Sequence, residues 1–157
     1  MIIKDIIDTD IVNYKEISMF IIFPVCNTFK CGKELCQNSK VALMSNIDIS
    51  IDSIIKRYIS NPMSNAIVCG GLEPFDSWND LYQLVTNFRN NNIKDVIVIY
   101  TGYTAEEIND KGYIEELKKY PNIIIKFGRF IPNQPHYYDD LLGVELTSSN
   151  QYSVRIS

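Results

Sequence analysis

Short apolar segments alternate along this chain with segments of helical periodicity, and this order constrains the fold most. The apolar segments are residues 19–25, 66–69, 96–100 and 123–125. Uninterrupted apolar strands are typical of a sheet that other elements cover. Strands that each lead into a helix predict a parallel sheet with right-handed crossover connections. We therefore predict an α/β fold with helices outside a parallel sheet.

Helical periodicity marks the segments between these strands. Apolar residues at helical spacing predict one helix near residues 51–59 and a second near residues 78–88. Asp48 or Ser50 is the expected cap of the first helix. The Thr-Ala-Glu-Glu sequence at 104–107 is typical of a capping box and predicts the start of a third helix.

The C-terminal part of the chain has a different pattern. Residues 130–140 are rich in Pro, Asn and Tyr, which predicts irregular structure. Residues 141–156 are expected to return as a strand or as a strap over the core. No linker or repeat separates these parts, so residues 1–157 are predicted to form a single domain.

Length and charge exclude several classes of protein. The 157 residues are too few for a full eight-unit β/α barrel, which needs about 250. A net charge of −4 without a basic stretch argues against nucleic acid as the main partner. No apolar run approaches the roughly 20 residues of a membrane span, and the first residues lack a secretion pattern. We therefore expect a cytoplasmic protein that does not act at a membrane.

Three of the four cysteines lie in one polar loop, residues 26–36, directly after the first predicted strand. Disulfides are rare in a reducing cytoplasm, so metal-binding or catalytic roles are favoured over disulfide bonds for Cys26, Cys31 and Cys36. Thiolates gathered this closely predict a metal site. Three thiolates leave one metal position open to a ligand from outside the protein. Cys69 lies in an apolar strand and is interpreted as a buried free thiol.

Structural zinc is the alternative interpretation of this loop. Its ligands would be the three loop cysteines together with His136 or Cys69. Structural zinc sites usually contain a Cys-x2-Cys pair, which residues 26–36 lack, so the spacing favours an iron–sulfur cluster. His136 is the only histidine and lies in a polar aromatic loop, where a surface role is the other interpretation.

Distinctive loops also follow the second and third predicted strands. Gly-Gly-Leu-Glu-Pro occupies residues 70–74, and Thr-Gly-Tyr occupies residues 101–103. In open α/β sheets, ligands bind beyond the carboxyl ends of the strands. The three loops are therefore predicted to meet at one ligand site. Read alone, 70–74 is an ordinary strand-to-helix turn, and the cap at Thr104 explains part of 101–103.

The cysteine triplet and the Gly-Gly-x-Glu-Pro sequence together resemble the radical S-adenosylmethionine (radical SAM) superfamily. Within it, the chain looks most like the activating proteins of anaerobic ribonucleotide reductase, a branch of the glycyl-radical-enzyme activases. Three further segments are similar to that branch: residues 13–15, 100–104 and 143–151. The resemblance spans about residues 13–151.

This resemblance implies a partial, open β/α barrel of parallel strands. It implies that Cys26, Cys31 and Cys36 ligate three irons of a 4Fe-4S cluster, whose fourth iron binds S-adenosylmethionine. Reductive cleavage of that cofactor would give a 5′-deoxyadenosyl radical, which installs a glycyl radical on the large subunit of the reductase. The implied electron donor is a flavodoxin or ferredoxin. The implied contacts of S-adenosylmethionine are Leu35, Gly70, Gly71, Leu72, Glu73, Pro74, Thr101, Gly102 and Tyr103.

The sequence departs from the superfamily pattern at several positions. The common triplet is Cys-x3-Cys-x2-Cys, whereas this chain has Cys-x4-Cys-x4-Cys. Leu35 stands where an aromatic residue is frequent, Leu72 is an insertion, and Phe127 replaces the Asp of an Asp-Gly pair. Lys126 and Arg129 are interpreted either as contacts of the cofactor's carboxylate or as solvated surface charges.

Two other functions remain open at this point. A radical SAM enzyme that modifies another protein or peptide would use the same cluster chemistry. A 4Fe-4S binding module without catalysis would need only the three cysteines of residues 26–36. The short chain favours a macromolecular substrate, because little sequence remains to enclose a small one.

Overall fold

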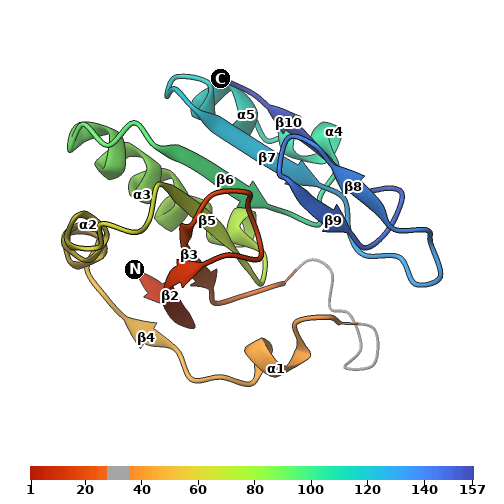
Figure 1. Ribbon diagram of the computed structural model, residues 1–157, viewed down its shortest axis with the longest axis horizontal. Coiled ribbons are helices and arrows are strands. Elements are labelled where there is room, and N and C mark those ends of the chain that lie inside the picture. Colours follow the sequence, from red (N-terminus) through yellow and green to blue (C-terminus); the bar gives the residue numbers. More distant parts are fainter. Residues whose placement is uncertain (28–35) are drawn as a thin grey trace.

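A six-stranded mixed sheet forms the centre of the computed structural model, which describes residues 1–27 and 36–157 (Figure 1). The strand order across the sheet is β10-β7-β6-β5-β3-β2, and the four inner strands are parallel. The two outermost strands, β2 and β10, each pair antiparallel with their neighbour. The strands are β2 (Asp5–Asp10), β3 (Ser18–Phe23), β5 (Ala66–Gly71), β6 (Val96–Tyr100), β7 (Ile123–Phe127) and β10 (Tyr152–Arg155).

The four predicted apolar segments form the four parallel strands, which confirms the α/β prediction for the inner sheet. The antiparallel outer strands make the sheet mixed, so the expectation of an all-parallel sheet was wrong at both edges. Because β2 and β10 stand at opposite ends of the strand order, the described sheet is open. A partial barrel of the radical SAM type stays a prediction.

Helices cover one face of this sheet. They are α2 (Ile51–Ser60), the 3-10 turn η1 (Pro74–Ser77), α3 (Trp78–Asn90), α4 (Ala105–Asn109) and α5 (Tyr113–Leu117). Their apolar side chains pack in one buried cluster with alternate residues of the inner strands, among them Ile67, Ile97 and Ile125. The predicted helices therefore form, and each lies where its apolar stripe can be buried.

The predicted helix caps are present. The Ser50 hydroxyl accepts a hydrogen bond from the Ser53 amide, so Ser50, not Asp48, caps α2. Thr104 and Glu107 form a reciprocal capping box at the start of α4. Both sets of bonds satisfy amide groups that lack partners within the helix itself.

Short elements complete the fold. Helix α1 (Ser39–Ala42) follows the cysteine loop, and two small sheets pair β1 (Ile2–Ile3) with β4 (Ile47–Asp48) and β8 (Tyr137–Asp139) with β9 (Val144–Leu146). Strand β8 lies in the segment that was predicted to be irregular, so that prediction was wrong at its end. The expected return of residues 141–156 as strand is confirmed by β9 and β10.

The second face of the sheet has no helix over it among the described residues and is covered by segments from both ends of the chain (Figure 1). Tyr14 and Leu142 pack there in a second buried cluster with inner-strand residues. The Lys15 amide donates to the Leu142 carbonyl at 2.7 Å, and the Tyr100 hydroxyl donates to the Asn13 carbonyl at 2.6 Å. Two of the segments that carry the family resemblance therefore meet over this face.

Gly71 provides a test of how tightly β5 packs at its carboxyl end. It has φ +84°, and a Cβ there would lie 2.4 Å from Ile22 Cγ2. Gly71→Ala should lower the free energy of unfolding by about 2–4 kcal/mol, because a left-handed backbone and an overpacked contact each add a cost. Gly112→Ala is the matched control, since Gly112 has φ +73° with nothing within 4 Å of a new Cβ. Urea denaturation of both variants that gave equal losses would contradict this account.

Candidate functional site

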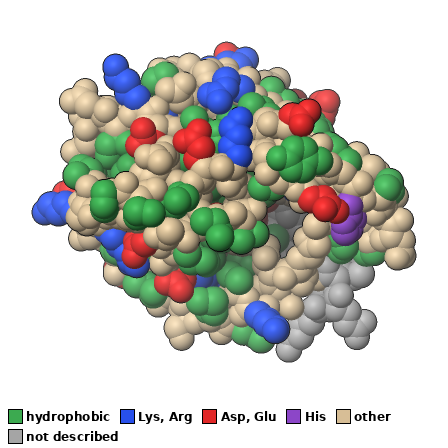
Figure 2. Space-filling view, viewed as in Figure 1, with side chains coloured by type: hydrophobic (Ala, Val, Ile, Leu, Met, Phe, Trp, Pro, Cys, Tyr) green, Lys and Arg blue, Asp and Glu red, His purple; other side chains and the backbone are tan. Residues whose placement is uncertain are grey.

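A cavity of about 450 Å³ opens at the carboxyl ends of the parallel strands. It lies on the side of the sheet away from α2, α3, α4 and α5, and Figure 2 shows a hollow in this face to the right of its centre. The volume falls within the range of small-molecule sites, about 300–1,000 Å³. Its lining includes Phe20, Cys26, Cys36, Asn38, Gly71, Leu72, Glu73, Tyr100, Thr101, Gly102, Lys126, Gly128, Arg129 and Gln151.

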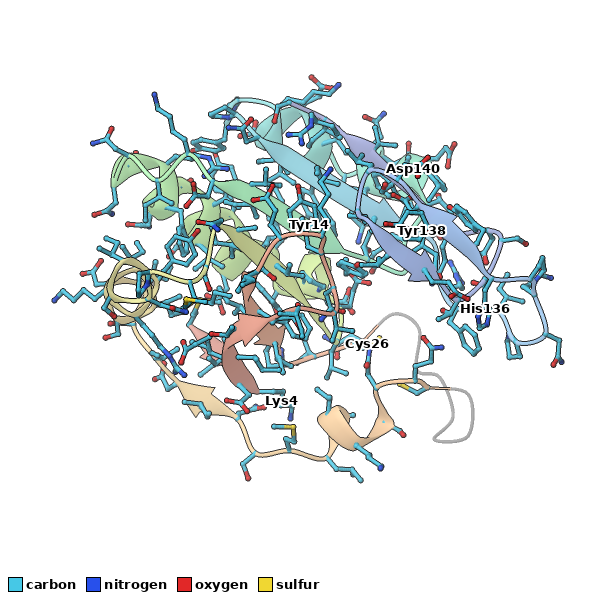
Figure 3. The ribbon with its side chains drawn as sticks, in the orientation of Figure 1. Lys4, Tyr14, Cys26, His136, Tyr138 and Asp140 are labelled. Atoms are coloured by element: carbon cyan, nitrogen blue, oxygen red, sulfur yellow. The ribbon has the colours of Figure 1, made fainter. Side chains whose placement is uncertain are left out.

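Two of the predicted metal ligands line this cavity. Cys26 follows β3 and Cys36 precedes α1, and both side chains are half-buried. Figure 3 shows Cys26 just beyond the end of β3. Cys31 and Leu35 lie outside the described residues. Cysteine thiolates are the donors that an iron–sulfur cluster needs, so the residues present fit that cofactor. Within residues 1–27 and 36–157, no group of three or more His, Cys, Asp or Glu side chains could hold a metal ion.

Hydrogen bonds hold the two ends of the cysteine loop against η1 and the end of β5. The Asn27 amide donates to Asp76 Oδ2 at 2.6 Å. On the other side of the loop, Asn38 Nδ2 donates to the Gly71 carbonyl at 2.5 Å. The two flanking cysteines are therefore positioned by contacts that do not depend on a bound metal.

The Gly-Gly-Leu-Glu-Pro loop enters the site only in part. Gly71, Leu72 and Glu73 line the cavity, whereas Gly70 and Pro74 do not. Gly70 has another reason to be glycine, because a Cβ there would lie 3.0 Å from the Phe20 ring. For Pro74 the turn interpretation is the better one, since it begins η1 and is buried.

Glu73 joins the ends of neighbouring strands. Its carboxyl oxygen Oε1 accepts from the Phe75 amide at 3.1 Å and from Thr101 Oγ1 at 2.8 Å. The other oxygen, Oε2, accepts from the Gly102 amide at 2.9 Å. The Glu73 amide donates to the Val25 carbonyl at 2.8 Å. Glu73, two residues beyond the end of β5, thereby binds both the loop that follows β3 and the loop that follows β6.

The residues of the Thr-Gly-Tyr loop face two different sides of the sheet. Thr101 and Gly102 line the cavity, as predicted. Tyr103 is buried away from it, where its hydroxyl donates to Asp76 Oδ1 at 2.7 Å and Lys111 lies over its ring. Asp76 connects Tyr103 to the start of the cysteine loop, and no motif in the sequence pointed to this residue.

The two alternative zinc ligands are not in the cavity lining. Cys69 is fully buried in the helix-side core, and burial raises the pKa of its thiol to about 12. His136 is exposed beside β8, with Nδ1 3.0 Å from Glu145 Oε1 (Figure 3). The structure therefore places neither residue beside Cys26 and Cys36.

A family model described as "4Fe-4S single cluster domain" matches residues 26–152, which is most of the chain. The chain therefore belongs to this iron–sulfur family. No curated protein and no solved structure shows significant similarity to it. The matched range begins at Cys26, the first of the three cysteines. The prediction of a 4Fe-4S cluster is confirmed at the level of the family.

The comparison leaves the finer predictions untested. A cluster domain is compatible with a redox enzyme, but the family description does not mention S-adenosylmethionine or a glycyl radical. No helix in the described part of the chain has the length and apolar character to cross a membrane.

Replacing each loop cysteine tests the cluster site directly. Cys26→Ala, Cys31→Ala and Cys36→Ala should each lose most of the iron and the visible absorbance gained on anaerobic reconstitution, because each removes a thiolate ligand. Cys69→Ala is the matched control and should retain both, since Cys69 lies in the core. Iron analysis that found full loading in Cys26→Ala would contradict the assignment.

Glu73 should make folding stability depend on pH. Burial is the main cause that raises the pKa of its carboxyl from 4.5 to about 7, although three hydrogen bonds oppose the shift. Its stabilising contribution is therefore complete below about pH 4.5 and is lost as the pH rises through about 7. Relative to Glu73→Gln, the wild-type free energy of unfolding should fall by up to about 3 kcal/mol over this range.

Urea denaturation of both proteins from pH 4.5 to pH 7.5 measures this difference. The range ends below the pKa of the buried Lys126, which is lowered to about 8. A gap between the two proteins that stayed constant with pH would show that Glu73 does not titrate in this window.

Proposed function

We propose that this protein is a radical SAM enzyme that activates a glycyl radical enzyme, in the first instance an anaerobic ribonucleotide reductase. The observation that carries the proposal is the convergence of three separate loops on one cavity. Cys26, Glu73 and Gly102 come from the loops after three different strands, and all line it. Membership of a 4Fe-4S family supports the cofactor half of the proposal.

The cavity residues have distinct tasks in this proposal. Cys26, Cys31 and Cys36 would hold the cluster, and the adjacent cavity would hold S-adenosylmethionine. When bound and reduced, the cluster supplies one electron, which cleaves the sulfonium C5′–S bond to give methionine and a 5′-deoxyadenosyl radical. The hydrogen atom would then come from a glycine of the partner, with 5′-deoxyadenosine and a glycyl radical as the products. The protein orients the reactants and keeps water away from them.

A macromolecular substrate suits the rim of this cavity. Val12 lines the cavity and is 71% exposed, and Ile11 beside it is 72% exposed. Leu43 and Met44, which follow α1, are also exposed. Apolar side chains exposed in neighbouring positions are typical of protein contact surfaces. A loop of a large reductase subunit could cover them while it places its glycine at the cavity.

The residue at the end of β7 differs from the radical SAM pattern, and this difference supports a second candidate function. Phe127 occupies the position of the family's Asp, and its side chain packs into the helix-side core rather than into the cavity. A function of that carboxylate is therefore missing from this chain. A radical SAM enzyme with a different protein or peptide substrate is the alternative that this difference favours. In either case we place the protein in the cytoplasm, with a flavodoxin or ferredoxin as electron donor.

Electron paramagnetic resonance of the anaerobically reconstituted, dithionite-reduced protein tests the proposal. The signal of the reduced cluster should change when S-adenosylmethionine is added, and 5′-deoxyadenosine should accumulate. Addition of the large subunit of an anaerobic ribonucleotide reductase from the same organism should then give a glycyl radical doublet. Cys36→Ala is the control that should lack all three signals.

Each outcome distinguishes one function from another. A cluster signal that does not change when S-adenosylmethionine is added would indicate a cluster-binding module without this chemistry. Formation of 5′-deoxyadenosine without a glycyl doublet on the reductase would point to another protein or peptide substrate.

A further inference from the structure

Two buried side chains of opposite charge line the cavity. Glu73 is 2% exposed and Lys126 is 6% exposed. Lys126 lies on β7 directly beside Tyr100 of β6, and Glu73 follows β5 on the other side of β6. Burying a charged group is costly unless it is paired or hydrogen-bonded. The partners of these two groups therefore indicate what the cavity is built to bind.

The protein itself satisfies only part of the hydrogen-bonding capacity of the Lys126 ammonium. Its ammonium has three donors, and one of them bonds to the Gly128 carbonyl at 2.8 Å. No carboxylate of the described residues lies within ion-pair distance of it. Burial lowers the pKa of Lys126 to about 8, and the charge of Glu73 opposes that shift. The ammonium therefore has donors left for an anionic group in the cavity.

The surroundings hold this ammonium in position. Gly128 has φ +94°, and a Cβ there would lie 2.8 Å from the Asn150 carbonyl oxygen. Gln151 Nε2 donates to the same Gly128 carbonyl at 3.3 Å. The Tyr100 ring centroid lies 5.8 Å from Lys126 Nζ. The ammonium is thus fixed by the backbone and by an aromatic ring rather than by a counter-charge.

Glu73 restricts which anions can bind here. Its three hydrogen bonds leave about one acceptor position on Oε2, since a carboxylate offers about four. A dianion such as phosphate would meet repulsion from Glu73. A group that carries a carboxylate and an ammonium on one carbon would instead satisfy both Lys126 and Glu73.

We propose that Lys126 binds the carboxylate of the α-amino acid end of the cavity's ligand and so selects for ligands that carry it. This inference rests on the proposed function, in which that ligand is S-adenosylmethionine. Lys126 is then a specificity-determining residue, whereas the adenosine end of the ligand lies beyond its reach.

Calorimetric binding to the anaerobically reconstituted protein tests this role without any turnover. S-adenosylhomocysteine keeps the amino acid end, and 5′-methylthioadenosine lacks it. Lys126→Met should weaken S-adenosylhomocysteine binding about tenfold or more, because a charge-assisted hydrogen bond is lost. Binding of 5′-methylthioadenosine should stay unchanged, which also shows that the variant is folded. Lys126→Arg should retain most of the affinity, and Lys56→Met on exposed α2 is the control for charge alone.

The outcomes separate this inference from the function on which it rests. If the wild type binds S-adenosylhomocysteine and Lys126→Met binds it equally well, Lys126 has no such role and the proposed function stands. If Lys126→Met weakens both ligands alike, its effect is on the fold of the cavity and the inference fails. If the wild type binds neither ligand, the proposed function fails and this inference with it.

Discussion

The carboxyl group of Glu73 organises the site. Parallel strands are joined by backbone bonds along their length, but the loops beyond their ends need other contacts to hold them. Glu73 supplies these contacts through Thr101 Oγ1 and the Gly102 amide, and its own amide binds the Val25 carbonyl. Three loops are thereby fixed around one residue that is 2% exposed. The hydrogen bonds offset the cost of burying the carboxyl, and they place Cys26 next to the β5 loop.

The two faces of the sheet explain why the cavity lies where it does. Helices fill one face with large apolar side chains, among them Phe88 and Leu84 of α3. Among the described residues, the other face has a thinner cover that includes Tyr14, Leu142 and Leu146. Beyond that cover the strand ends are left open, and polar groups of the loops can face a ligand there. The unequal cover therefore produces the cavity without any need for a closed barrel.

The sequence predicted those parts of the fold that local physics determines. The inner strands followed from β-branched runs such as residues 96–100, and α4 followed from its capping box. Strand β2 was missed because Asp5–Asp10 mixes acids with isoleucines, as an edge strand can. Tyr103 lies outside the cavity lining and in the helix-side core, because loop spacing does not decide which side of a sheet a side chain takes. Asp76 matters through contacts between distant segments, with Asn27 and Tyr103, which periodicity does not reveal.

The unusual cysteine spacing is compatible with this framework. The loop is held near each end, by Asp76 at the Asn27 amide and, two residues after Cys36, by Asn38 at the Gly71 carbonyl. Between such fixed ends, lengthening a loop from about seven to about ten residues costs only about 0.3 kcal/mol of closure entropy. Cys26 and Cys36 can therefore face one cavity whether the loop between them has the common length or this longer one. The position of the cluster is then decided by the ends of β3 and β5 more than by the number of residues between the thiolates.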